Sequence, residues 1–222
     1  MEEVRISFNF THDINQKEYA LKMLALLKKY EIEIEKIGSY EPIKKIFSEE
    51  AFVKMWTEGE DDFFSIIARL KKSKSYINFH NLKGGLIGNV GFIFVTSEKK
   101  FKKEEKWIQL FYEICRDWSP HRAFISKRFP ERDIYMYETG FSRPKEVEWM
   151  NYWSNELLSK DLRNSLLLLN WYKIIELNKG YLYQLTADVD DDDVYFMSEH
   201  ARQMVGEELL YRRSEDLDDL ED

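Results

Sequence analysis

Hydrophobic and polar positions along the chain follow two periods, and each change of period marks a new predicted element. Val4 to Phe10 alternates apolar with polar residues, which predicts a half-buried strand. Gln16 to Tyr30 spaces its apolar residues as an amphipathic helix does. Residues 31–41 alternate again and predict a second strand, which ends before Pro42.

The rest of the chain predicts further helices and strands by the same two periods. Helices are expected over Glu49 to Trp56, Asp61 to Lys72, Ser97 to Trp118, Asn155 to Asp161 and Glu199 to Tyr211. Extended segments are expected over Tyr76 to Leu82, Leu86 to Thr96, Ala123 to Ser126, Asp133 to Tyr137, Val147 to Trp153, Ser165 to Leu177 and Tyr181 to Thr186. Gly84-Gly85 and Asn178-Lys179-Gly180 predict the turns of two hairpins, because glycine tolerates positive φ.

The order of these elements predicts an α+β fold, with a largely antiparallel sheet built from hairpins and helices packed on it. No repeat of about 20–50 residues occurs, and no linker rich in Gly, Ser or Pro divides the chain. We therefore expect a single domain over residues 1–213, and leave open whether it consists of two related halves. Residues 214–222 have too few apolar side chains to pack, which predicts a disordered acidic tail.

The composition indicates the cellular compartment in which the protein works. A chain of 222 residues buries enough surface to need neither disulfides nor metal for its core. Its one cysteine, Cys115, has no internal partner, which indicates a reducing compartment. No stretch reaches the roughly 18 consecutive apolar residues of a membrane span, and the first residues do not resemble a secretion signal. We expect a cytoplasmic protein that uses no membrane and no cofactor.

The charge is distributed unevenly along the chain. The net charge is −8, and residues 188–222 hold fourteen acidic and only three basic side chains. An acidic end opposes nucleic-acid binding and favours a basic partner. Lysine clusters such as Lys99-Lys100 border predicted helices and lack interleaved aromatic residues, so we expect no nucleic-acid partner.

The residue types that carry out catalysis do not form a recognisable pattern. The four histidines, His12, His80, His121 and His200, lack the spacing of a metal site. No GxSxG motif is present, and the glycines of KGGLIGNVG match no phosphate-binding loop. Cys115 falls on the apolar face of a predicted helix, where a free cysteine acts as a small hydrophobic side chain. The sequence therefore predicts no catalytic residues.

The run DVDDDDVYFMSE requires separate consideration because its carboxylates approach the spacing of a calcium loop. Counted from Asp188, Asp190 and Asp192 are third and fifth, and Glu199 is twelfth. Asp193 occupies the sixth position, where the sharp turn of such a loop requires glycine. We therefore expect no bound metal, and interpret Asp188 to Asp193 as a solvated acidic loop suited to a basic partner.

Two segments resemble one protein family. VEWMNYWSNELLSKDL (147–162) is similar to a strand and short helix of immunity proteins from bacterial polymorphic toxin systems, in particular the immunity protein 52 family, with type VI secretion immunity proteins as neighbours. GYLYQLTADVDDDD (180–193), followed by a predicted helix, resembles the C-terminal part of the same families.

The resemblance implies an α+β protein that neutralises a cognate toxin and is not an enzyme. The acidic loop then becomes the predicted toxin-binding site, with residues Asp188, Asp190, Asp191, Asp192 and Asp193 meeting a basic toxin surface. The alternative function is a metal-dependent hydrolase that uses the Asp188–Asp193 loop with His200. In either case we expect Trp149, Tyr152 and Trp171 to be core residues, since they lie in apolar segments.

Overall fold

The computed structural model describes residues 3–58, 63–71, 73–82, 89–127, 147–189 and 193–205. The strands in these ranges are β1 Glu3–Phe10, β2 Ile34–Gly38, β3 Lys45–Ile46, β4 Phe63–Leu70, β5 Tyr76–Leu82, β6 Asn89–Ser97, β7 Arg122–Lys127, β8 Met150–Ser154, β9 Lys173–Leu177 and β10 Gly180–Gln184. The helices are α1 Lys17–Lys29, α2 Glu49–Thr57, α3 Glu98–Lys103, α4 Lys106–Trp118, α5 Lys160–Leu167 and α6 Asp193–Val205.

All described strands belong to one sheet in the order β3-β2-β4-β5-β6-β1-β7-β8-β10-β9. Each strand pairs with its neighbours in antiparallel orientation. Segments 3–97 supply six adjacent strands and segments 122–184 the other four, so the two parts meet where β1 pairs with β7. The predicted α+β fold with a largely antiparallel sheet is confirmed.

The alternation predicted in β1 determines which face of the sheet is apolar. Its fully buried side chains are Val4, Ile6, Phe8 and Phe10. Phe8 lies opposite Phe92 of β6 and Ala123 of β7, and paired residues of an antiparallel sheet share a face. The apolar face therefore continues across the middle of the sheet.

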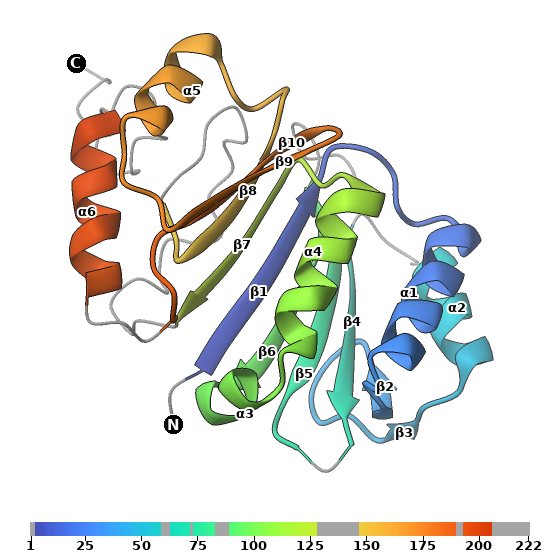
Figure 1. Ribbon diagram of the computed structural model, residues 1–222. Coiled ribbons are helices and arrows are strands. Elements are labelled where there is room, and N and C mark those ends of the chain that lie inside the picture. The colour runs from blue at the N-terminus through green and yellow to red at the C-terminus, as the bar shows by residue number, and fades with distance from the viewer. Residues whose placement is uncertain are drawn as a thin grey trace, which may run out of the picture.

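Helices α1 to α4 cover this apolar face, and α4 crosses in front of β1 and β6 (Figure 1). Phe111 of α4 lies 5.4 Å from Phe8, between ring centroids, and Trp56 of α2 lies 4.8 Å from Phe79 of β5. Full burial of an apolar side chain stabilises a fold by about 1.5–3 kcal/mol, so these aromatic contacts hold the helices on the sheet.

The opposite face of the sheet is covered at β10 by α5. Tyr181 and Tyr183 of β10 face away from α4, and the guanidinium of Arg163 on α5 lies 4.4 Å from the ring centroid of Tyr181. Trp171 follows α5, packs 4.9 Å from Tyr183 and donates its indole N–H to the carbonyl of Leu166. Helices therefore lie on both faces of this part of the sheet.

Two of the three predicted core aromatics are fully buried. Trp149 and Tyr152 are 2% and 0% exposed, which confirms their prediction. Trp171 is only partly buried and packs against the border of the core, so its prediction is not confirmed.

The helix predicted over Asp61 to Lys72 is wrong, because Phe63–Leu70 form strand β4. Ile66 and Ala68 are buried on one face, opposite Phe79 of β5 and Ile37 of β2. Pairing on both edges of the segment satisfies its backbone groups and overrides the helical spacing of its apolar residues.

The single helix predicted over Ser97 to Trp118 is divided into α3 and α4. Residues six positions apart on one straight helix point about 120° apart, since each residue turns the helix by about 100°. The break at Glu104 allows Phe101 and Trp107 both to face the sheet, where they contact Trp149 and Phe94. Burial of these two large rings therefore takes precedence over helix continuity.

Three boundaries in the C-terminal part also differ from expectation. Residues 155–157 form a turn, and the helix predicted there starts at Lys160 as α5. Ser165 to Leu167 belong to α5, so β9 begins only at Lys173. Helix α6 begins at Asp193 and not at Glu199, because the buried side chains Val194, Ser198 and Ala201 form one inward stripe.

Six elements agree with their predictions: β1, β2, β5, β7, α1 and α2. The turn at 83–88, the predicted strand Asp133 to Tyr137 and the predicted tail 214–222 lie outside the described residues. Among the helices that the structure describes, none combines the length and apolar character needed to span a bilayer.

Candidate protein-binding surface

Large hydrophobic side chains that stay exposed are concentrated in the C-terminal part of the described chain. Three occur before residue 60: Leu21, Tyr40 and Ile46. Seven occur between residues 160 and 205, and we call them the C-terminal surface: Leu167, Leu168, Tyr172, Ile174, Tyr195, Phe196 and Met204. Scattered apolar residues are normal on a protein surface, whereas a concentration of them marks an interaction site.

Helix α6 holds two of the three aromatic members of this surface, Tyr195 and Phe196. Val194, Ser198 and Ala201 point inward, and the Ser198 hydroxyl donates a hydrogen bond to the carbonyl of Val147 beside β8. This anchoring leaves Tyr195 and Phe196 outward, 47% and 69% exposed, with their rings in edge-to-face contact at 5.8 Å. Two rings that already support each other lose little conformational freedom on binding, which suits them to anchor a partner.

Three aliphatic members come from the end of α5 and from β9. In α5 the buried side chains are Leu162 and Leu166, so Leu167 and Leu168 project outward. Strand β9 is the last strand of the sheet order, and its Ile174 is exposed. Because α5 and α6 contact each other, the two leucines lie in the same part of the molecule as the α6 aromatics.

The predicted acidic loop connects β10 to α6. Asp188 is exposed, and its carbonyl accepts a 2.7 Å hydrogen bond from the Thr186 hydroxyl. Val189 is buried beside it, which fixes this end of the loop. Asp193 is exposed at the first position of α6, where a carboxylate is stabilised by the helix dipole. Asp190, Asp191 and Asp192 lie outside the described residues.

One residue of the predicted toxin-binding site therefore lies beside the aromatic pair of α6. Asp193 precedes Tyr195 by two positions, and both belong to the first turns of the same helix. The surface combines exposed aromatic and aliphatic groups with a carboxylate at one border. Such a surface complements a partner that is apolar at the centre of contact and basic at its edge.

Metal-ligating side chains are not brought together in the described ranges. No group of three or more His, Cys, Asp or Glu side chains in them could hold a metal ion. His200 is exposed on α6 and His80 is half-buried on β5, where burial lowers its pKa. The hydrolase alternative would need a set of metal ligands. Among the described residues, Asp188, Asp193 and His200 do not form one.

Cys115 lies on the buried side of α4, as the sequence predicts. Burial raises the pKa of its thiol well above the usual value. A thiol that stays protonated and enclosed is a poor nucleophile. Its position next to the Tyr152 side chain is that of a packing residue.

Sequence reasoning located the acidic loop but missed the hydrophobic part of the surface. The run SLLLLN falls in the predicted extended segment Ser165 to Leu177, and only Leu166 of its central leucines is fully buried. Four consecutive leucines do exceed what one helical face can bury, and this excess is the signal that could have indicated an exposed patch.

Comparison with known proteins identifies a similar fold. The chain is similar to the structure titled Pseudomonas aeruginosa T6SS protein PA0821, with a TM-score of 0.57 and 14% identity, over 92% of this chain and 76% of that one. Clostridium acetobutylicum aspartate kinase aligns with a TM-score of 0.28 and 10% identity, over 90% of this chain and 32% of that one, which is too low to indicate a shared fold. No protein-family model matches the chain, and no curated protein does.

Proposed function

We propose that this protein is an immunity protein, which binds a cognate bacterial toxin and neutralises it by protein–protein contact. The observation that carries the proposal is the C-terminal surface, where exposed aromatic side chains of α6 adjoin the acidic Asp193. The fold similarity to a T6SS protein is compatible with this function. The resemblance of residues 147–162 and 180–193 to immunity families supports it independently, because it comes from the sequence.

The partner that fits this surface is a toxin with a basic face. Binding energy in such complexes comes from a few buried anchors, and Phe196 and Tyr195 are the most suitable residues for this role. The carboxylates at the border add long-range attraction, which accelerates association and aligns the two proteins. The toxin is then inhibited because its functional face is covered, and this requires no catalysis by the immunity protein.

The experiment tests binding and protection together. The product of the neighbouring toxin gene is expressed in bacteria with wild-type protein, with Phe196→Ala or with Leu21→Ala as a matched control. Leu21 is 48% exposed on α1, at the other side of the molecule from α6 (Figure 1), so its loss removes apolar surface without touching the proposed interface. Affinity is measured by calorimetry and protection by growth.

We expect Phe196→Ala to weaken binding by about 2 kcal/mol or more, as the loss of an interface anchor does, and to abolish protection. Leu21→Ala should match wild type in both assays. Equal behaviour of the two variants would place the interface elsewhere. Absence of any complex with the wild-type protein would refute the immunity function.

A further inference from the structure

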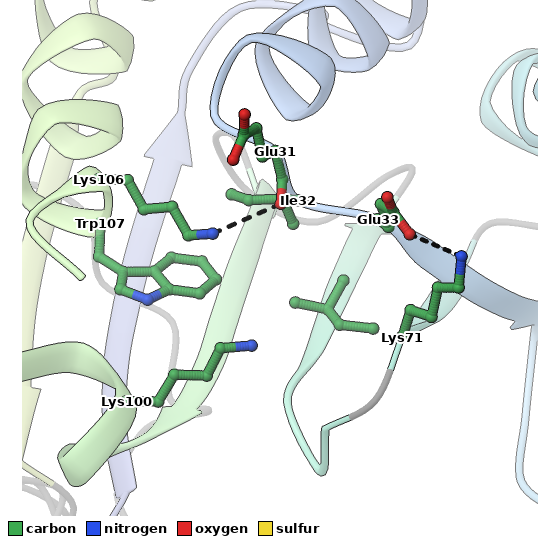
Figure 2. A pocket seen from close by; sticks show the side chains of 8 residues that line it. Glu31, Ile32, Glu33, Lys71, Lys100, Lys106 and Trp107 are labelled. Atoms are coloured by element: carbon green, nitrogen blue, oxygen red, sulfur yellow. Dashed lines mark hydrogen bonds and ion pairs between the residues drawn. The ribbon is translucent and has the colours of Figure 1, made fainter. Parts of the chain in front are cut away.

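A pocket of about 230 Å³ lies between α1, β4, α3 and α4, away from the C-terminal surface. Its lining residues are Glu31, Ile32, Glu33, Leu70, Lys71, Lys100, Lys106 and Trp107 (Figure 2). Ile32 and Leu70 are buried and form an apolar wall, while three lysines supply ammonium groups. We propose that this pocket binds the oxyanion of a small organic molecule, a phosphate or a carboxylate.

The charges that line the pocket leave one cation available for a ligand. Lys71 pairs with Glu33 at 2.8 Å. The Nζ atom of Lys106 lies 3.3 Å from Glu104 Oε2, which is an ion-pair distance. The two groups lack hydrogen-bond geometry, since this oxygen accepts no hydrogen bond. Among the described residues, Lys100 forms no ion pair with a carboxylate; its ammonium lies 6.0 Å from the ring centroid of Trp107.

The remaining carboxylate at the pocket, that of Glu31, does not neutralise this cation. Figure 2 shows the Glu31 carboxylate pointing away from Lys100, while the Glu31 carbonyl accepts a hydrogen bond from Lys106. Lys106 Nζ also lies 5.9 Å from the Trp107 centroid, so two ammonium groups approach the same indole. The centre of the pocket is therefore positive and its acidic groups are at the rim.

One feature of α4 adds to the attraction for an anion, although Glu105 at the N-cap position already meets the positive end of the helix dipole. The indole N–H of Trp107 is buried and has no acceptor among the described residues. In Figure 2 the indole nitrogen lies on the ring edge that faces Lys100.

A buried donor without an acceptor requires an explanation, and water or a ligand is the usual one. The flexible side chain of Lys100 covers this edge of the indole, and its movement would allow an oxyanion to accept from both groups. Charge-assisted hydrogen bonds of this kind are short and strong. A volume below the roughly 300–1,000 Å³ of pockets for drug-sized ligands restricts the ligand to a small molecule.

The pocket is tested with the full-length protein and two probes, inorganic phosphate and acetate, which separate the phosphate source from the carboxylate source. Chloride at matched ionic strength is the reference. Titrations are followed by calorimetry and by the indole N–H signals in a proton–nitrogen NMR spectrum. The chain has six tryptophans, and Trp107→Phe identifies the Trp107 signal by its disappearance.

We expect the Trp107 indole signal to shift with phosphate or with acetate and not with chloride. Lys100→Met should weaken the binding of that anion about tenfold or more, as expected for the loss of a charge-assisted contact. Lys99→Met, a neighbouring exposed lysine outside the pocket lining, should leave the affinity within about twofold of wild type.

Trp107→Phe keeps an aromatic ring in the pocket wall but removes the N–H donor together with the five-membered ring of the indole. It should weaken binding of the same anion, and the loss of buried volume should lower thermal stability modestly. A chloride effect equal to that of phosphate and acetate would overturn the proposal, as would equal losses in Lys99→Met and Lys100→Met. If Trp107→Phe does not fold, the comparison of Lys99→Met with Lys100→Met still tests anion binding at the pocket. Neither outcome bears on toxin binding at the C-terminal surface.

Discussion

The hydroxyl of Tyr30 donates a 2.5 Å hydrogen bond to the carboxylate of Glu113, although the two residues are 83 positions apart. Tyr30 follows the last residue of α1 and Glu113 is in the middle of α4, so this bond connects two helices on the same face of the sheet. Lys29 approaches the same carboxylate oxygen at 2.5 Å. Two donors therefore meet one charged acceptor between α1 and α4.

We predict that Tyr30→Phe lowers the free energy of unfolding by about 1.5 kcal/mol at pH 7, as expected for a hydrogen bond to a charged group. Burial, followed by the bond to Glu113, raises the pKa of Tyr30 from 10.0 to about 12. The contribution is thus complete below pH 10 and is lost as pH rises toward 12. Tyr172→Phe, at an exposed tyrosine, is the control and should change stability by less than about 0.5 kcal/mol in urea unfolding.

Glu113→Gln tests the other member of the pair, with the opposite pH dependence. Burial would raise the pKa of Glu113, but hydrogen bonds from Lys29 and Tyr30 outweigh it and hold the pKa below its usual 4.5. A carboxyl with a lowered folded pKa stabilises the protein above the unfolded pKa and loses this contribution as pH falls through the folded value. The variant should therefore be less stable than wild type at pH 7, by about 1.5–3 kcal/mol, and nearly equal to it near pH 3. A difference that persists unchanged at pH 3 would contradict the ionic origin of the link.

Such long-range contacts mark the limit of what the sequence predicts. The alternation in β1 and the helical spacing in α1 identify both elements, because each depends on a single amphipathic face. Strand β4 was mistaken for a helix because its apolar residues suit both periods, and only pairing with β2 and β5 decides between them. The division of α3 from α4 likewise depends on Trp149, which approaches Phe101 only in the folded sheet.

The candidate site was predictable only in its charged part. Asp188 and Asp193 could be identified because a cluster of carboxylates has no place in a core. The hydrophobic part depends on which leucines and aromatics remain uncovered after packing, and periodicity alone does not reveal this. The exposure of Phe196 follows from the anchoring of Ser198 on Val147, a contact between segments 51 positions apart.

Gly180 in β10 is expected to resist substitution because of close packing and not because of its φ angle. A Cβ atom there would collide with the carbonyl of Trp153 and approach the Tyr152 ring to 2.8 Å. Gly180→Ala should destabilise the protein by about 1–3 kcal/mol, as overpacking does. Gly38→Ala is the matched control in β2, since its Cβ would meet Ile43 at an ordinary 3.4 Å. Thermal unfolding of both variants measures the contrast, and similar losses would argue against a packing origin.

Cys115 should be chemically silent in the folded protein. Its side chain is 1% exposed, and burial raises the pKa of the thiol, so both access and thiolate formation are suppressed. We predict no reaction with an aromatic disulfide reagent at pH 8 over minutes, and reaction of one thiol per chain after unfolding in guanidinium. Glu50→Cys adds a thiol at an exposed site and should react at once. Rapid labelling of the wild-type protein would show that α4 opens from the sheet.

The last prediction concerns the acidic border of the C-terminal surface and rests on the proposed toxin partner. Complementary charges accelerate association at low salt and lose most of this effect when screening shortens to ~8 Å at physiological ionic strength. Asp188→Asn combined with Asp193→Asn should therefore slow association with the toxin at low salt and reduce its salt dependence, with little change in the dissociation rate. Glu49→Gln combined with Glu50→Gln removes the same charge from exposed positions on α2 and is the control for net charge. If the two double variants slow association equally, the total charge of −8 acts at long range and the 188–193 segment has no special role. If only the aspartate variant does so, the carboxylates meet the basic face of the toxin directly, and the same substitutions of Asp190, Asp191 and Asp192 should extend the effect.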